Sequence, residues 1–76
     1  MDWREHIAMD ADVLAGKPVV KGTRLAVSFL VDLMAQGWSV ADLLANYPRL
    51  TDADVRACLA YASESLEREA VYPLAV

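Results

Sequence analysis

Residues 16–25 constrain the fold of this 76-residue chain most, because two of its three glycines bracket a β-branched pair there. The stretch reads Gly-Lys-Pro-Val-Val-Lys-Gly-Thr-Arg-Leu, which is typical of a turn, a short strand and a second turn. Pro18 cannot donate to a sheet ladder, so it should begin the strand or lie at a sheet edge. We therefore expect a strand over residues 18–21.

The chain before this stretch offers a partner for that strand. Residues 6–9 contain a short apolar run, and the turn-forming residues Asp10 and Asp12 follow it. A strand over residues 6–9 would pair antiparallel with the later strand, and a helical turn over residues 13–15 would end at the first glycine. Because a two-stranded ribbon is marginal in water, we expect the ribbons of two copies to join.

Three segments with helical spacing follow the ribbon. Residues 27–36 are apolar on most sides and end before Gly37. Ser39 caps the second segment, and Pro48 stops it. Thr51 caps the third, whose first turn is acidic. The apolar residues predicted to line the inner face of the third helix are Val55, Leu59, Ala62 and Leu66.

The predicted fold is mainly α: a tri-helical helix-turn-helix bundle of the homeodomain or winged-helix kind, with a short N-terminal β-ribbon. A chain this short makes one domain, residues 1–76. We divide it into a ribbon arm over residues 1–25, a three-helix unit over residues 26–66 and a tail over residues 67–76.

The composition predicts a partner. Hydrophobic residues make up 57% of the chain, while a domain of this size buries only about 60% of its unfolded surface. The surplus apolar surface favours a homodimer or a bound protein. The single cysteine permits no internal disulfide, and the N-terminus is polar, so we expect a cytoplasmic protein without a signal peptide or membrane span.

Catalytic chemistry has little support in the sequence. The only histidine, His6, lies near an N-terminus that we expect to fray, and Cys58 has apolar neighbours and reads as a small buried hydrophobe. Metal sites need several ligands at defined spacing, and the acidic pairs here are better interpreted as turn and cap residues. We expect no enzyme, no cofactor and no metal.

Anion binding has more support, because several cations gather in an acidic chain of net charge −4. Alternatively, Arg24 neutralises carboxylates of a neighbouring helix or of a second subunit, and the lysines are simply solvated. A helix-turn-helix reads bases with the start of its third helix, but Asp52 and Asp54 at that position disfavour contact with phosphates. The candidate nucleic-acid-binding residues are Lys17, Lys21, Arg24, Arg49 and Arg56.

Two blocks of the sequence resemble a known family. The run GKPVVKGTRL, followed by GWSVADLLANYPRLTDADVRACLAYA, is similar to the small bacterial family called domain of unknown function 433, over residues 7–66. Ala15 stands where that family often has a second glycine, and Ala26 where it often has proline. The resemblance implies a compact helix-turn-helix-like antitoxin that binds a toxin resembling PIN-type ribonucleases and, as a complex or a dimer, operator DNA.

The tail is the segment available for a toxin. It is apolar, and we expect Tyr72 and Leu74 to contact a partner protein. The alternative function is a homodimeric interaction protein with no role in nucleic-acid binding, which the acidic third helix favours.

Overall fold

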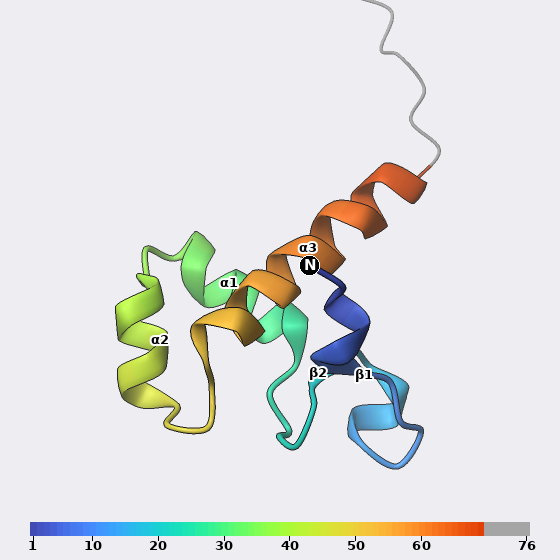
Figure 1. Cartoon of the computed structure of the whole chain (residues 1–76), viewed down its shortest axis with the longest axis horizontal. Helices are drawn as coiled ribbons and strands as arrows, with labels where there is room; N and C mark the ends of the chain where they lie inside the picture. Colours follow the sequence, from blue (N-terminus) through green and yellow to red (C-terminus); the bar gives the residue numbers. More distant parts are fainter. Residues whose placement is uncertain (70–76) are drawn as a thin grey trace, which may run out of the picture.

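The computed structural model describes residues 1–69, which form three α-helices and a two-stranded ribbon (Figure 1). This confirms the predicted mainly α fold with its N-terminal ribbon. No helix in this part of the chain is long and apolar enough to cross a membrane. In chain order the elements are the 3₁₀ helix η1 (Trp3–Glu5), strand β1 (Ile7–Ala8), the 3₁₀ turn η2 (Leu14–Gly16), strand β2 (Val19–Val20), and helices α1 (Val27–Ala35), α2 (Val40–Asn46) and α3 (Asp52–Arg68).

The ribbon is shorter than predicted, but its two strands run antiparallel, as predicted. β1 and β2 pair antiparallel, with Ile7 opposite Val20. On its other side β2 is also occupied, because Val19 bridges Ala26 and the amide of Val27 donates to the carbonyl of Pro18 at 2.9 Å. β2 therefore has hydrogen-bonding partners on both sides, which leaves it no edge for the ribbon of a second copy.

Helices α2 and α3 begin where the sequence predicts, and for the same reason. The Ser39 hydroxyl accepts from the amide of Asp42 at 3.0 Å, and the Asp42 carboxylate accepts from the amide of Ser39 at 2.8 Å. Thr51 and Asp54 repeat this reciprocal pair at 3.1 and 3.0 Å. Aspartate thus fills the place that glutamate or glutamine takes in the usual capping box.

The core lies where the ribbon, α1 and α3 meet. Its largest fully buried side chains are Leu30, Leu43, Val20, Val55 and Cys58. The η1 segment lies along α3 (Figure 1), and the ring of Trp3 meets that of Tyr61 edge-on with centroids 4.9 Å apart. The half-buried tryptophan therefore anchors the N-terminal segment to the longest helix.

The predicted inner face of α3 is partly wrong. Val55 is buried, but Leu59 is 47% exposed and Leu66 is 62% exposed. The helix also turns Ala57 and, as predicted, Cys58 inward, and its second half extends past α1 and the ribbon (Figure 1). Hydrophobic spacing identified an apolar stripe correctly, but only its first residue, Val55, lies in the core, and Leu59 and Leu66 stay exposed in the described chain.

Helix α1 is also less buried than predicted. Val27, Leu30 and Leu33 face the core, whereas Phe29 is 42% exposed. The core of so small a domain covers one side of this helix fully, so Val31 and Met34 are only half-buried against it and Phe29 stays at the surface.

The turn before β2 is left-handed, which the sequence did not predict. Leu14, Ala15 and Gly16 have φ angles of +48°, +56° and +82°, so the predicted helical turn is left-handed. Only glycine adopts this region without strain. Ala15 therefore occupies a conformation in which glycine would be unstrained.

We predict that Ala15→Gly stabilises the chain, by about 0.5 kcal/mol. Relief of a left-handed alanine is worth about 1 kcal/mol, and the added freedom of the unfolded chain offsets about half of that. Ala60→Gly, in the middle of α3, is the control and should cost about 1 kcal/mol. Urea unfolding measures both, and a loss of stability with Ala15→Gly would contradict the strained turn.

Candidate nucleic-acid interface

The loop that follows β2 is fixed by one hydroxyl group. The Thr23 side chain donates to the carbonyl of Val20 at 2.8 Å and accepts from the amide of Leu25 at 3.0 Å. Gly22, with φ of +77°, supplies the left-handed residue that this turn needs. The side chains on either side of the turn, Lys21 and Arg24, are both exposed.

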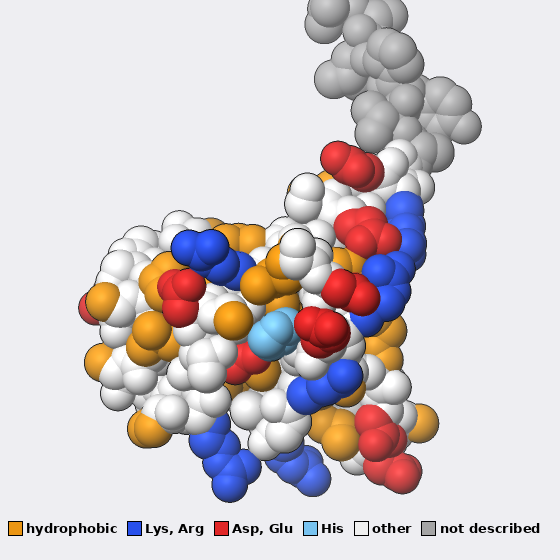
Figure 2. Space-filling model, in the orientation of Figure 1, with side chains coloured by type: hydrophobic (Ala, Val, Ile, Leu, Met, Phe, Trp, Pro, Cys, Tyr) orange, Lys and Arg blue, Asp and Glu red, His pale blue; other side chains and the backbone are white. Residues whose placement is uncertain are grey.

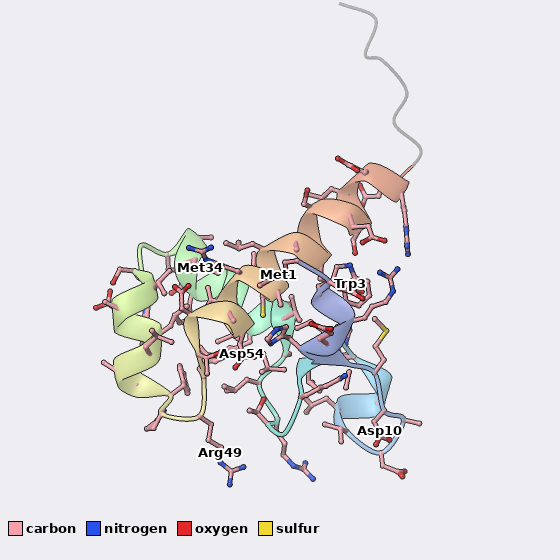
Figure 3. All side chains as sticks on the ribbon, in the orientation of Figure 1. Met1, Trp3, Asp10, Met34, Arg49 and Asp54 are labelled. Atoms are coloured by element: carbon pink, nitrogen blue, oxygen red, sulfur yellow. The ribbon has the colours of Figure 1, made fainter. Side chains whose placement is uncertain are left out.

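The connection between α2 and α3 brings a third cation to this loop. Arg49 donates from Nη1 to the carbonyl of Gly22 at 3.1 Å, and it extends from the edge of the molecule (Figure 3). Lys21, Arg24 and Arg49 line one shallow hollow of about 520 Å³. We call these three residues the basic cluster.

The basic cluster differs from the other arginines in its partners. Within residues 1–69, none of its members forms an ion pair, whereas Arg4, Arg56 and Arg68 all pair with carboxylates. Asp10 also lines the hollow, but its carboxylate accepts from the amide of Asp12 at 2.9 Å. Lys and Arg side chains project into solvent from the same edge (Figure 2). The alternative that Arg24 neutralises an internal carboxylate finds no partner in this part of the chain.

Two of the predicted anion-binding residues lie elsewhere. Lys17 lines an apolar groove between α1 and α3, not the hollow of the basic cluster. Arg56 lies on the exposed side of α3 and pairs with Asp52 one turn earlier, at 3.0 Å. The predicted partner-binding residues Tyr72 and Leu74 lie outside the described residues.

The first turn of α3 is tied to the N-terminal segment. His6 Nδ1 lies 2.9 Å from Asp54 Oδ1, and both side chains are largely buried. The expectation of a frayed His6 is therefore wrong, because η1, capped by Asp2, holds this histidine against α3. The carboxylate of Asp54 accepts from the amide of Thr51 and contacts His6, so the start of α3 presents negative charge where a phosphate would have to approach.

Titration of two groups reflects this arrangement. Burial alone would raise the pKa of Asp54, but hydrogen bonds from His6 and Thr51 outweigh it and lower the pKa below its ordinary value. Burial, with the charge of Asp54 nearby, raises the pKa of Cys58 to about 11. As predicted, Cys58 is a buried thiol and not an exposed nucleophile. In the described part of the chain, no group of three or more His, Cys, Asp or Glu residues could hold a metal ion.

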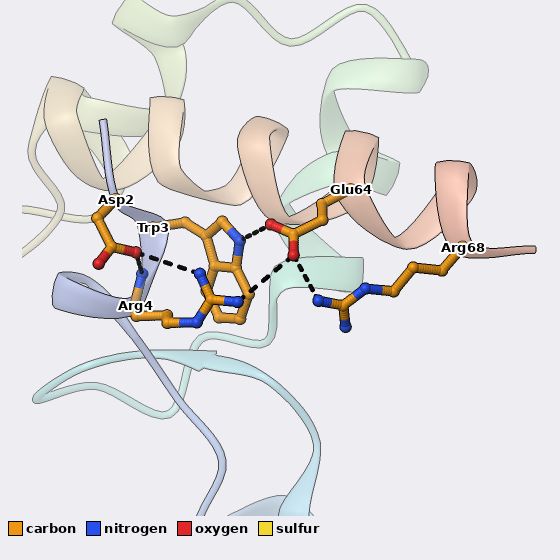
Figure 4. Close-up of polar contacts among 5 residues, drawn as sticks. All are labelled: Asp2, Trp3, Arg4, Glu64 and Arg68. Carbon is orange, nitrogen blue, oxygen red and sulfur yellow. Dashed lines mark hydrogen bonds and ion pairs between the residues drawn. The ribbon is translucent and has the colours of Figure 1, made fainter.

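A second polar site, around Glu64, has no signal in the sequence. Its carboxylate accepts from Trp3 Nε1 at 2.5 Å, from Arg4 at 3.4 Å and from Arg68 (Figure 4). The hydrogen bond from Trp3, and then the two arginines, lower the pKa of Glu64. The guanidinium of Arg4 also lies 4.5 Å from the ring centre of Trp3. These contacts fasten the N-terminal segment to α3, so we assign them a structural role.

Comparison with known proteins identifies the family. The model of DUF433, described as a protein of unknown function, matches residues 7–62. The chain belongs to the DUF433 family. A crystal structure of a DUF433 member from Anabaena variabilis ATCC 29413 superimposes with a TM-score of 0.76 at 35% sequence identity, covering 82% of this chain and 61% of that one.

A second relative is considerably longer. The uncharacterized protein y4eO of Sinorhizobium fredii (strain NBRC 101917 / NGR234) is 37% identical over 59 residues, which cover 78% of this chain. The match spans only 27% of that protein. These similarities establish the fold and the family, and neither relative carries a described activity.

We predict a pH-dependent stability effect at Asp54. Its pKa is lower in the folded state, so its carboxylate stabilises the fold at a pH above the unfolded value of about 4. That contribution is lost as the pH falls through the lowered pKa. Asp54→Asn should therefore cost about 1 kcal/mol near neutral pH, and its unfolding free energy should converge with that of the wild type in acid.

The control for this prediction is Asp52→Asn, which removes an exposed ion pair on the same turn and should change stability by no more than about 0.5 kcal/mol. Urea unfolding at a series of pH values measures all three proteins. If the unfolding free energy of Asp54→Asn stays below that of the wild type by the same amount down to low pH, the charge of this carboxylate does not contribute to stability.

Proposed function

We propose that this DUF433 protein is the antitoxin of a type II toxin–antitoxin pair, acting in the cytoplasm. It binds a PIN-like ribonuclease toxin and operator DNA, and it acts by occupying surfaces and not by chemistry. The observation that carries the DNA-binding half of this proposal is the basic cluster: Lys21, Arg24 and Arg49 lie together without a carboxylate partner in the described chain.

The basic cluster suits phosphate contacts. Cations near phosphates release condensed counterions, and this release supplies much of the affinity for DNA. The backbone beneath the three side chains is fixed by the turn at Gly22 and Thr23 and by the hydrogen bond from Arg49. Binding therefore costs little main-chain conformational entropy. Such contacts position a protein on the duplex and carry no sequence information by themselves.

The proposed DNA contact differs from that of a standard helix-turn-helix. In that motif the start of the last helix enters the major groove. In this chain Asp52 pairs with Arg56 and Asp54 is engaged by His6 and Thr51. We therefore place the phosphate contacts on the loop after β2 and on the α2–α3 connection, with Lys17 and Arg56 as secondary contacts.

The same acidic turn supports a second candidate function. A homodimeric interaction protein without a nucleic-acid role would not need positive charge on α3, the helix that would read bases in a helix-turn-helix. Two carboxylates at the start of α3 fit that role, because they stabilise the helix dipole while repelling phosphates.

A salt titration separates the two candidates. We expect binding to DNA from upstream of the protein's own gene, measured by fluorescence anisotropy, to weaken as salt rises. Replacing Lys21 and Arg24 by glutamine should lower the slope of log affinity against log salt by about 0.9 for each lost phosphate contact. Neither side chain has a hydrogen-bond partner within residues 1–69, so folding should be unaffected.

Arg68→Gln is the matched control, because Arg68 is an exposed arginine that pairs with Glu64 and lies outside the basic cluster. Its slope should equal that of the wild type. Absence of DNA binding at low salt would favour the interaction protein.

The toxin-binding half is tested with the tail. We expect the chain to co-purify with a ribonuclease encoded beside it and to inhibit that enzyme. Tyr72→Ala and Leu74→Ala should each weaken the complex by about tenfold or more if they act as anchors, as measured by calorimetry. The Lys21→Gln, Arg24→Gln variant should retain toxin binding, and a tail variant that binds the toxin normally would remove these two residues from the interface.

A further inference from the structure

The second half of α3 carries an exposed apolar stripe. Leu59 and Leu66 are 47% and 62% exposed, and they are seven residues apart, so they point in nearly the same direction about two turns apart. Ser63 lies between them and is also exposed. This part of the helix projects beyond the rest of the described chain (Figure 1). We call the exposed residues Arg56, Leu59, Ser63, Leu66 and Glu67 the leucine face.

We propose that a second copy of this chain covers the leucine face, with the two α3 helices packed antiparallel. The twofold axis of this pair crosses the helices at the height of the peptide bond between Ala62 and Ser63. It places Leu59 of each copy opposite Leu66 of the other. The residues at the centre, Ala62 and Ser63, are small, so the helices can approach closely while the leucines close both ends.

The charges on the leucine face select this orientation. Arg56 and Glu67 flank the stripe on the same side, because they are eleven residues, or about three turns, apart. In the antiparallel pair, Arg56 of one copy lies beside Glu67 of the other, and the symmetry makes this contact twice. A parallel twofold pair would place the flanking charges of the two copies on opposite sides of the interface, so this pairing of Arg56 with Glu67 would not form.

Both charged groups are available for this contact. Arg56 has an exposed pair with Asp52 only, in which the two side chains are 73% and 59% exposed. Glu67 forms no ion pair within residues 1–69. The contact therefore adds a partner for Glu67 without breaking a buried one.

The surroundings of the stripe favour a second copy over solvent. Leu66 also lines the apolar groove of about 460 Å³ between α1 and α3, together with Val27, Val31 and Ala62. If a second copy covered the leucine face, the apolar surface of this groove would continue into the interface between the two copies. The ribbon, where the sequence predicted such a joint, has β2 occupied on both sides. The inference does not rest on DNA or toxin binding, and of the residues proposed to contact phosphates only Arg56, a secondary contact, belongs to the leucine face.

The first test is oligomeric state. The full chain should sediment as a dimer in analytical ultracentrifugation. Leu59→Glu and Leu66→Glu should each weaken dimerisation by about thirtyfold or more, as for an interface anchor. Met9→Glu is the matched control, because Met9 is 53% exposed but lies outside α3, and its dimer should match the wild type. Circular dichroism and urea unfolding of the monomeric variants check that each remains folded.

The second test is charge reversal, which determines the orientation. Arg56→Glu and Glu67→Arg should each weaken the dimer by about tenfold, and the double variant should restore it, because each copy then again opposes unlike charges. Failure of the double variant to recover would overturn the antiparallel register.

Two other results would overturn the proposal as a whole. One is a wild-type chain that stays monomeric at high micromolar concentration, which would leave the leucine face to a different protein. The other is a dimer that both leucine variants leave intact, which would place the joint elsewhere, for example on the tail or the outer edge of β1.

Discussion

Val19 and Ala26 pair through their backbones on the side of β2 that faces away from β1. This bridge forces the chain to reverse within the residues between them, and it makes the reversal the loop that carries Lys21 and Arg24. It also places the first amide of α1 against the carbonyl of Pro18, so the direction of α1 follows from that of the ribbon. Val20 faces the core at 1% exposure, and the ribbon is stable here because helices cover it.

The arginines and lysines of the described chain fall into two groups that differ in their partners. The ion-paired arginines serve the fold, either along α3 or between α3 and the N-terminal segment. The basic cluster, by contrast, makes a single side-chain hydrogen bond within residues 1–69, from Arg49 to a backbone carbonyl. An acidic protein that keeps such a group unpaired loses the Coulomb energy of internal pairs, though at an exposed site this loss is small.

Local signals in the sequence predicted the helix starts well. Ser39 and Thr51 each act on the amide three residues later, so the information lies within one turn. Contacts between distant segments were not predictable in this way. His6 meets Asp54, and Trp3 meets Glu64, across separations of 48 and 61 residues, and no local pattern marks either pair.

Periodicity has a further limit in this chain. It located the stripe of Leu59 and Leu66 but could not distinguish a core face from a face left at the surface, since both have the same spacing. The basic cluster was half predictable: Lys21 and Arg24 are neighbours in sequence, but the approach of Arg49 depends on the tertiary fold.

The position of Cys58 has a practical consequence for following motions of this domain. Its sulfur is completely enclosed beneath the first turns of α3, and its raised pKa keeps it in the unreactive protonated form at neutral pH. A thiol reagent can reach it only when α3 separates from α1 and the ribbon. The rate of alkylation therefore measures how often the core opens, without any introduced label.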